Sequence, residues 1–294
     1  MKKIFIVGSI NTDLVIKTPY MPQKGETLTG DGFFIAHGGK GANQAVATAR
    51  LGGKVVMCGC VGNDSFGKEA VESLKRDGID TTYIRTVDGV STGTAIIIVS
   101  CGDNRIILDK GANAFLNKND IDQALKDAKS GDIYLTQLEN PIEVIGYGLK
   151  KAHEKGMYVV LNPAPANKEV LEYVKYCNLI TPNETELEIL GGRELLLNMG
   201  IDILVTLGEK GFEIINANDK QTYPCIKIKP VDTTAAGDTL CGGLVARLSS
   251  GCGLVESAKY GSLAASIACT REGAQPSIPL KKEVDEVLNK TIKK

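Results

Sequence analysis

A short run of small and acidic residues carries the groups that phosphoryl transfer needs. The sequence Asp-Thr-Thr-Ala-Ala-Gly-Asp-Thr-Leu begins at Asp232 and leads into an apolar segment with helical periodicity. The small residues Ala235, Ala236 and Gly237 would leave the start of that helix open, so that its free N–H groups and its dipole can face an anion. Asp238, in the first turn, would accept a proton from an attacking hydroxyl. An ordinary helix start is the competing interpretation for Gly-Asp or Asp-Thr alone, but not for the whole run.

A glycine-rich turn near the N-terminus opens a second predicted helix. It reads Gly-Gly-Lys-Gly-Ala-Asn-Gln from Gly38 to Gln44. It lacks the pattern of a Walker loop, and Gln44 stands where a dinucleotide fingerprint has its third glycine. Its glycines would let the backbone approach a ligand closely, and Lys40 and Asn43 would donate to hydroxyl groups. A tight strand-to-helix turn uses the same residues and is an equal alternative.

Polar residues also follow the first predicted strand. Asn11 and Asp13 lie at its end, which is where ligands bind in an open α/β sheet. A carboxylate there could accept hydrogen bonds from two neighbouring sugar hydroxyls. Because Asn and Asp are common turn residues, a plain turn is the alternative.

Two more polar segments each follow a predicted strand. Asn183 and Glu186 would lie on one face of a helix and could order the water shell of a metal ion near a triphosphate. Gly208 and Gly211 could let a nucleotide lie against the backbone of the segment Thr206–Gly211. A solvated helix face and an ordinary turn are the alternatives.

Composition argues against several other classes of protein. The 294 residues include 34 Lys and Arg against 35 Asp and Glu, unlike a nucleic-acid or membrane-surface protein that binds through positive charge. Two histidines are too few for most zinc or serine-hydrolase sites. No stretch reaches the ~18 apolar residues of a membrane helix, and the N-terminal apolar run is too short for a signal peptide. The 8 scattered cysteines are typical of buried thiols in a reducing cytoplasm.

The elements that must position these residues alternate along the chain. Apolar, β-branched runs predict strands at Lys3–Val7, Val55–Cys60, Ile133–Thr136, Tyr158–Leu161, Leu179–Thr181 and Ile203–Thr206. Helical patterns occupy Ala42–Leu51, Phe66–Asp77, Pro141–Glu154, Glu184–Leu190 and most of the chain from Gly237 onward. This alternation predicts an α/β protein with a mostly parallel sheet that helices cover on both faces.

Two segments interrupt the alternation and predict a small antiparallel sheet. Residues 12–37 carry short apolar runs at Leu14–Ile16, Thr27–Thr29 and Phe33–Ile35 between prolines and glycines. Residues 94–109 predict a hairpin that turns at Cys101–Asn104. Because such a sheet would project from the body, we expect it to cover a ligand as a lid or to contact another subunit.

Taken together and in order, these motifs resemble the ribokinase family of carbohydrate kinases. The resemblance runs from Gly8–Asp13 through Gly38–Gln44 and Thr181–Glu186 to Asp232–Asp238, and the segments Asn162–Ala166 and Thr270–Pro279 resemble the ribose kinases within that family. It implies a three-layer α/β/α ribokinase-like fold, with one domain over residues 1–294 and a β-sheet lid. It also implies ATP-dependent phosphorylation of the 5-hydroxyl of D-ribose, in the cytoplasm. Lids of this family pair to form homodimers, so the resemblance implies that partner as well.

The same resemblance implies a role for each motif residue. The pentose would contact Asn11, Asp13, Gly39, Lys40, Asn43, Glu139 and Asp238. Asp238 would be the base, and the amides of Ala235, Ala236 and Gly237 would form an anion hole. ATP would be lined by Asn183, Thr206, Leu207, Gly208, Glu209, Lys210, Gly211, Gly237 and Ser262, with Glu186 acting on Mg²⁺ through water. Potassium would be held by Asp232, Thr234, Ala268, Arg271, Gly273 and Ser277, mainly through backbone oxygens.

Other functions are compatible with parts of this pattern. A related kinase could act on deoxyribose, a nucleoside or a hexose derivative, although the predicted lid offers only Tyr20, Phe33 and Phe34 to stack on a base. A non-catalytic sugar or nucleotide sensor would have no need of Asp238 and the Gly237 turn. A dinucleotide-dependent dehydrogenase is excluded because its glycine fingerprint is absent.

Overall fold

A nine-stranded sheet forms the centre of the molecule in the computed structural model, which describes residues 1–100 and 103–292. Its spatial order is β13 (Lys220–Tyr223), β12 (Phe212–Ile215), β11 (Asp202–Thr206), β10 (Leu179–Ile180), β9 (Tyr158–Leu161), β8 (Ile133–Thr136), β1 (Lys3–Val7), β4 (Lys54–Gly62) and β5 (Asp80–Val87). The strands from β11 to β5 pair in parallel, whereas β12 and β13 pair antiparallel at one edge. The prediction of a mostly parallel sheet is therefore confirmed.

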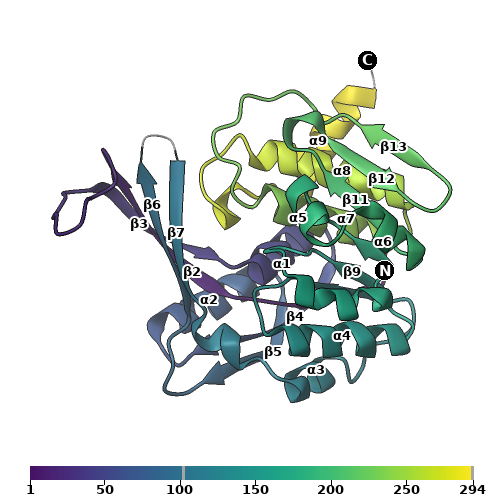
Figure 1. Cartoon of the computed structure of the whole chain (residues 1–294), viewed down its shortest axis with the longest axis horizontal. Coiled ribbons are helices and arrows are strands. Elements are labelled where there is room, and N and C mark those ends of the chain that lie inside the picture. Colours follow the sequence, from purple (N-terminus) through teal and green to yellow (C-terminus); the bar gives the residue numbers. More distant parts are fainter. Residues whose placement is uncertain (101–102, 293–294) are drawn as a thin grey trace.

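Helices cover both faces of this sheet, and they complete the three layers that Figure 1 shows. One face carries α1 (Lys40–Arg50), α2 (Ser65–Arg76), α7 (Ala236–Ser249) and α8 (Leu254–Ala268), with α9 (Lys281–Ile292) packed outside α8. The other face carries α3 (Lys118–Ala124), α4 (Ile142–Glu154), α5 (Glu184–Ile189) and α6 (Arg193–Asn198). The expected α/β/α architecture is confirmed.

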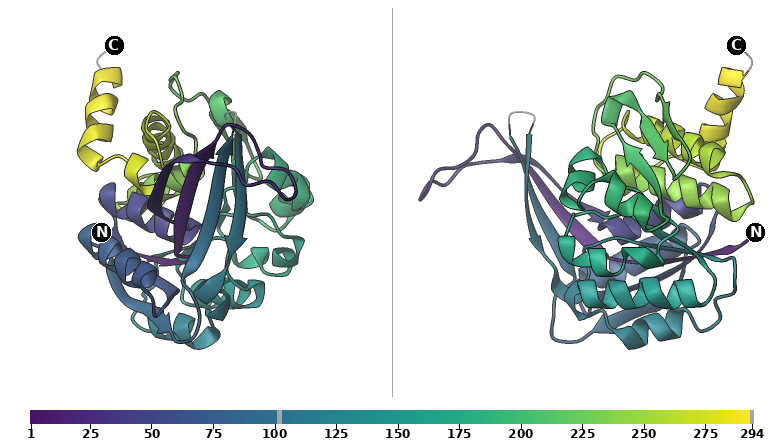
Figure 2. Two further views of the ribbon diagram at one scale, coloured as in Figure 1. Left: turned by 90° about the vertical axis from the view of Figure 1, so that its left-hand side faces the viewer. Right: turned by 45° about the vertical axis from the view of Figure 1, so that its right-hand side comes forward.

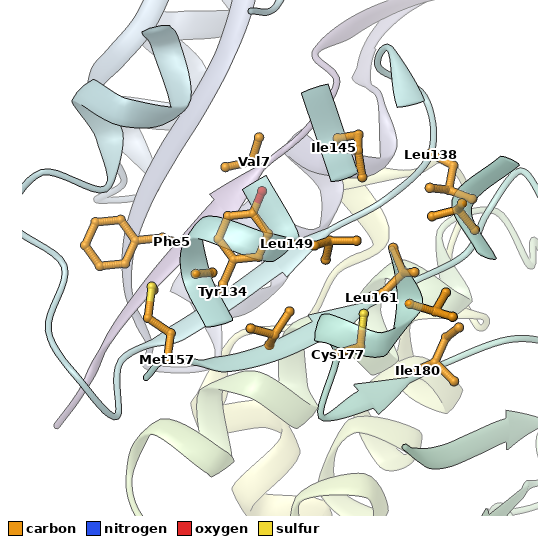
Figure 3. Packing of buried hydrophobic residues seen from close by; sticks show 14 of the residues in the cluster. Phe5, Val7, Tyr134, Leu138, Ile145, Leu149, Met157, Leu161, Cys177 and Ile180 are labelled. Carbon is orange, nitrogen blue, oxygen red and sulfur yellow. The ribbon is translucent and has the colours of Figure 1, made fainter. Parts of the chain in front are cut away.

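Apolar side chains on alternate sides of the strands build two cores. Phe5 and Val7 of β1 pack with Tyr134 and Leu149 in the core beside α3 and α4 (Figure 3). Ile6 points the other way, toward α1 and α7. Burial on both sides explains why the central strands have continuous apolar sequences rather than an alternating pattern.

A second sheet of four strands projects from the body. Its order is β3 (Asp31–Gly38), β2 (Asn11–Thr18), β6 (Gly93–Ser100) and β7 (Asp103–Asp109). Figure 2 shows this sheet from its broad side and from its edge. The sheet is mixed, and the prediction of a purely antiparallel one is wrong, because β2 and β6 both leave the body in the same direction and pair in parallel.

The two predicted lid segments differ from expectation in one further respect. The run Thr27–Thr29 forms no strand, and the chain from Pro19 to Gly30 is a loop in which the Tyr20 hydroxyl donates to Glu26 Oε1 at 2.6 Å. The hairpin of β6 and β7 is confirmed. Its predicted turn, Cys101–Asn104, is too long, because Asp103 and Asn104 pair with Ser100 and Val99 as part of β7. Residues 101–102 lie outside the described residues.

The structure also shows the lengths of the apolar helices and the state of the cysteines. Among residues 1–100 and 103–292, no helix combines the length and the apolar character that a bilayer crossing requires. Seven cysteines lie in the described part, and each is a free thiol. Five are buried as predicted, but Cys225 and Cys252 are partly exposed.

Candidate active site

Close packing of α1 against α7 places two motifs side by side. A Cβ on Gly242 would lie 2.4 Å from the Cβ of Ala47, so only glycine allows the two helices to approach this closely. As a result, the first turns of both helices meet, although they are almost 200 residues apart in the sequence. Asp238 at the start of α7 is buried there, with 5% of its surface exposed.

Both oxygens of the Asp238 carboxylate accept hydrogen bonds from side-chain amides of α1. Asn43 Nδ2 donates to Oδ2 at 3.1 Å, and Gln44 Nε2 donates to Oδ1 at 2.9 Å. Gln44 is held in turn by Asn162 and Gln137, two buried residues at the ends of β9 and β8. The sequence motif contained Gln44, but nothing in its spacing indicated that Gln137 and Asn162 would meet it. These residues give Asp238 one fixed orientation.

The backbone before α7 is bent sharply. Ala235 has a φ of 60°, the only left-handed non-glycine residue within the described ranges, and such a conformation costs about 1–2 kcal/mol. No side chain caps α7. Ala236 N–H donates to Thr233 O at 3.1 Å, so that amide is occupied. The N–H groups of Ala235, Gly237 and Asp238 have no acceptor among the described residues, and they are available to an anion.

A polar cavity of about 260 Å³ opens in front of this helix start. Its wall comprises Lys40, Asn162, Ala164, Thr181, Asn183, Glu186, Thr206, Thr233, Ala235, Ala236, Gly237, Asp238 and Cys241. A Cβ on Gly237 would meet no atom within 4 Å, which means that this glycine leaves space in the cavity. The nearby Asp238 carboxylate is the main reason that the pKa of Lys40 lies above its usual range. The cavity therefore pairs a cation with free backbone donors, a combination suited to phosphate oxygens.

Buried acceptors without donors mark the side of Asp238 that faces β2. Asn43 Oδ1 is buried and has no hydrogen-bond partner, and no group in the described chain donates to the Asp13 carboxylate. Burial, followed by repulsion from Glu139, raises the pKa of Asp13 to about 7. A Cβ on Gly38 would lie 2.3 Å from Asp13 Oδ2, so the carboxylate is pressed against the glycine-rich turn. Hydroxyl donors would satisfy these acceptors.

Hydrogen bonds from neighbouring residues fix two other predicted sugar contacts, Glu139 and Asn11. Glu139 Oε2 accepts from Ser9 Oγ at 2.5 Å and from Lys40 N at 3.1 Å. Asn11 Oδ1 accepts from Asn113 Nδ2 at 2.8 Å, and the sequence analysis did not identify Asn113. Gly39 is the residue before α1 and has a φ of 87°, which explains the need for glycine there.

A larger cavity of about 660 Å³ adjoins the polar one and shares Thr206, Thr233, Ala236 and Gly237 with it. Seven of the nine residues predicted to contact ATP line it, namely Thr206, Gly208, Glu209, Lys210, Gly211, Gly237 and Ser262. Asn183 lines the smaller cavity instead. Leu207 lines neither cavity, because its side chain packs against the hydrophobic core. The apolar wall includes Ile226, Ile228, Leu240, Ala265 and Cys269, which the sequence analysis did not identify.

Asn183 and Glu186 have a structural role that differs from the predicted one. Asn183 is the N-cap of α5, not a residue on its face, because its side chain accepts from Glu186 N at 2.8 Å. Glu186 Oε2 accepts from Asn183 N at 2.8 Å, which completes a capping box. Both still line the polar cavity, where burial raises the pKa of Glu186.

The loops before α7 and after α8 bring several predicted potassium ligands together. Asp232 Oδ1 accepts from Thr234 N at 2.8 Å and Oδ2 from Gly273 N at 2.9 Å, so one carboxylate ties the two loops. These hydrogen bonds outweigh burial and lower the pKa of Asp232. Ser277 is buried in the same loop, and its hydroxyl donates to Ala274 O at 2.7 Å.

The remaining predicted potassium ligands, Ala268 and Arg271, lie at the end of α8 and in the loop after it. Ala268 O accepts from Arg271 N at 3.0 Å, and the Arg271 side chain pairs with Glu283. Within the described ranges, no three His, Cys, Asp or Glu side chains converge as a metal site. Carbonyl and hydroxyl oxygens suit a monovalent cation such as potassium better than zinc.

Known proteins are similar to this chain over nearly its whole length. Residues 1–281 match the model of the pfkB family carbohydrate kinases. A ribokinase of Haemophilus influenzae is 41% identical over 301 residues, with 98% of each chain covered, and a deoxyribokinase of Salmonella typhi is 38% identical over 302 residues, with 97% of this chain and 98% of the relative covered. The structure of Arabidopsis thaliana ribokinase complexed with ribose and ATP superposes with a TM-score of 0.86 at 29% identity, over 98% of both chains. The chain therefore belongs to the pfkB family of carbohydrate kinases.

Proposed function

We propose that this protein transfers the γ-phosphate of ATP to the 5-hydroxyl of D-ribose and forms D-ribose 5-phosphate. One observation carries the proposal: the amide-held carboxylate of Asp238 lies between buried hydroxyl acceptors and a helix start with free N–H groups. A base must face the acceptor hydroxyl on one side and the moving phosphoryl group on the other. The likeness to ribokinases supports ribose as the acceptor.

On the acceptor side, the residues position the sugar by hydrogen bonds. Asp13 and Asn43 Oδ1 accept from hydroxyls, and Glu139 supports the turn that carries Lys40. The 5-hydroxyl then lies at Asp238, which takes its proton as the oxygen attacks. Asn11 and Gly39 complete the proposed sugar site.

On the donor side, ATP occupies the 660 Å³ cavity with its base against the apolar wall. Its phosphates extend into the polar cavity, where the amides of Ala235 and Gly237 and the ammonium of Lys40 face the transferred group. Glu186 contacts the water shell of Mg²⁺, which neutralises phosphate charge when it is bound. Because Ala236 N–H is already donated to Thr233 O, that amide is not part of the proposed anion hole.

Potassium occupies the proposed site between the Asp232 loop and the loop that follows α8. The residues fit such an ion because Asp232 fixes the two loops to each other and the remaining ligands are mainly backbone oxygens. The bound ion would stiffen the loop that presents the free amides without contacting the reacting atoms.

We propose that the protein works in the cytoplasm. In the same proposal, the four-stranded sheet covers the sugar site as a lid and forms the contact between two subunits of a homodimer. Strand register places Leu14, Ile35, Ile96 and Ile107 in one row on the face opposite Asp13. Ile35, Ile96 and Ile107 are 50%, 45% and 64% exposed, so this row lacks a cover. A second copy of the chain would bury it.

Deoxyribose is the second candidate acceptor, because the Salmonella typhi deoxyribokinase is nearly as similar to this chain as the ribokinase. An assay of ADP release over ribose, deoxyribose, nucleosides and hexoses, with and without potassium, tests both candidates. We expect the highest kcat/KM with ribose and activation by potassium.

Asp238→Asn tests the proposed base. The variant should bind sugar and ATP as the unmodified protein does, but kcat should fall by about 10²–10⁴, the usual effect of losing a positioned base. Asp127→Asn, on the exposed surface after α3, is the matched control and should retain full activity. Turnover of Asp238→Asn near the unmodified rate would show that another group accepts the proton.

A further inference from the structure

A chain of buried side-chain amides runs from the backbone of Thr181 to the carboxylate of Asp238. Asn162 Nδ2 donates to Thr181 O at 3.0 Å, and Asn162 Oδ1 accepts from Gln44 Nε2 at 3.1 Å. Gln44 Nε2 also donates to Asp238 Oδ1 at 2.9 Å, and Gln44 Oε1 accepts from Gln137 Nε2 at 2.6 Å. All four side chains are at least nine-tenths buried, so water does not compete for these bonds.

One backbone group, the carbonyl of Thr181, fixes which end of each amide in this hydrogen-bond network donates and which accepts. A carbonyl oxygen can only accept, so the Nδ2 of Asn162 must face Thr181 O, and its Oδ1 must face Gln44. Gln44 therefore has to present Nε2, whose two hydrogens serve Asn162 and Asp238. Turning the Gln44 amide over would place its oxygen against two acceptors and leave Gln137 Nε2 unpaired, which is unfavourable for buried polar groups.

The two oxygens of Asp238 consequently differ. Oδ1 faces a donor that cannot become an acceptor, so a proton on Oδ1 would oppose the Gln44 N–H. Oδ2 faces Asn43, whose Oδ1 is buried without a partner in the absence of sugar. Rotation of that amide would let Oδ1 accept from a protonated Oδ2 and would turn Nδ2 toward the oxygen of a sugar hydroxyl. A proton on Oδ2 is therefore favoured over one on Oδ1, because only the amide beside Oδ2 can turn from donor to acceptor.

We propose that Gln44 is a positioning residue for the reaction: it holds Oδ1 of Asp238 as an acceptor and directs the proton of the sugar hydroxyl to Oδ2. The inference rests on the proposed function, because it takes Asp238 as the base. In the transfer step the hydroxyl O–H bond breaks, the proton passes to Oδ2, and the hydroxyl oxygen bonds to the phosphoryl group as ADP leaves. Gln44 contacts neither the sugar nor ATP in this proposal.

The titratable groups that interact with Asp238 come from three helices. Lys40 of α1 and Glu186 of α5 face it across the polar cavity, and Cys241 lies one turn further along α7. Changing Gln44 leaves all three groups in place, so a change in pH dependence would come from the bond to Oδ1.

Gln44→Glu tests the inference, because it keeps the shape of the side chain and its bond from Gln137 but removes the donor to Asp238. We expect the single-turnover phosphorylation rate to fall about 10²-fold, and the acid limb of its pH profile to move to higher pH, because a second carboxylate favours protonation of the pair. The KM values for ribose and ATP should stay within about threefold, since Gln44 contacts neither substrate.

Thr48→Val is the matched control on the same helix. Thr48 Oγ1 donates to Gln44 O at 2.6 Å and is fully buried, so the variant weakens α1 without touching the Asp238 bond. It should lower Tm but leave the acid limb unchanged. If Gln44→Glu does not fold, Gln137→Met is the second variant, because it removes the hydrogen bond that Gln137 Nε2 donates to Gln44 Oε1. We expect its rate to fall by about 3–10-fold at constant KM.

Two results would overturn the inference. The first is a Gln44→Glu enzyme whose rate and acid limb match those of the unmodified enzyme while Asp238→Asn is inactive. A Gln137→Met enzyme with an unchanged rate would count in the same way. The other is a rise in ribose KM that exceeds the loss of rate, which would make Gln44 a sugar ligand. An active Asp238→Asn enzyme would instead refute the proposed function itself, so the two failures are distinguishable.

Discussion

At the scale of single residues, the candidate sugar site combines acceptors that the empty protein leaves unsatisfied. Asn43 Oδ1 lies buried beside Asp238 without a partner, and no group in the described chain donates to the partly buried Asp13 carboxylate. Burial of polar groups without partners is unfavourable, so the site stores free energy that hydroxyl donors can release. Ligand binding and the stability of the free protein are therefore opposed at these residues.

Because the pKa of Asp13 is raised, the conflict between sugar binding and the stability of the free protein can be measured as a dependence on pH. The pKa of Asp13 is about 7 in the folded protein and 3.8 in an unfolded chain, so the folded state binds more protons between these values and stability falls as pH rises. From pH 5 to pH 8 the contribution lost is up to about 3 kcal/mol. Asp13→Asn should lack this loss, so its advantage over the unmodified protein in sugar-free urea denaturation should grow with pH.

Sugar binding should show the opposite dependence on pH, because only the ionised Asp13 accepts from two hydroxyls. Below about pH 7 the ribose KM of the unmodified enzyme should rise, and Asp13→Asn should have a high KM with little change across this range. Parallel pH profiles of ribose KM for the two proteins would contradict a sugar contact at Asp13.

At the scale of elements, helix α1 joins three parts of the site. Its start carries Lys40, and its first turn holds Asp238 through Asn43 and Gln44. At its end, Arg50 donates from Nε and Nη2 to both oxygens of Asp77 at 2.7 and 3.1 Å. Arg50 Nη1 also donates to the carbonyls of residues 275 and 278, in the proposed potassium loop. One helix therefore connects the glycine-rich turn, the proposed base Asp238 and that loop.

Arg50→Gln tests this connection. The variant should lower the free energy of unfolding by about 2 kcal/mol, less than a fully buried pair because both partners retain some exposure. It should also raise the potassium concentration for half-maximal thermal stabilisation by about tenfold, because the loop loses its restraint from α1. Arg76→Gln, an exposed arginine at the end of α2, is the control and should change neither quantity. A potassium titration of Arg50→Gln that matches the unmodified protein would separate α1 from the ion site.

At the scale of the whole molecule, the projecting sheet has two exposed faces with different neighbours. Pairing of Asp13 with Ala95, and of Ala95 with Leu108, places these residues on the face toward the sugar site. Ile106 lies on that face, two residues from Leu108, whereas Ile107 lies on the other. Both isoleucines are at least 60% exposed, so neither face is covered within one chain.

Lysine substitutions should separate the two faces. Ile107→Lys should convert a dimer to a monomer in sedimentation velocity with little change in ribose KM, because it places charge in the row that a second copy would bury. Ile106→Lys should leave the dimer intact and raise ribose KM. Leu195→Lys, an exposed apolar residue of α6, is the control for lysine at the surface. Unchanged sedimentation of Ile107→Lys from a dimeric parent would assign the contact elsewhere.

Much of the fold could be predicted because local patterns decide it. The strand at Lys3–Val7 and the helix from Pro141 follow from apolar runs buried on both faces and from ordinary start signals, and the structure places both within one residue. The strands β12 and β13 were not predicted, since each has only four residues and β13 is the polar edge strand of the sheet. The parallel pairing of β2 with β6 could not be predicted either, because it depends on where two distant segments leave the body.

The amino-acid sequence by itself determined which groups are available: the proposed base, the glycine turns, the carboxylates proposed to contact the sugar, and their order along the chain. Only the tertiary structure decided how those groups are held. It made Asn183 an N-cap, turned Leu207 into the core, and brought Gln137, Gln44 and Asn162 together behind Asp238. The physical reason is that hydrogen bonds between distant segments depend on how closely helices pack, and here the Gly242 contact with α1 sets that distance.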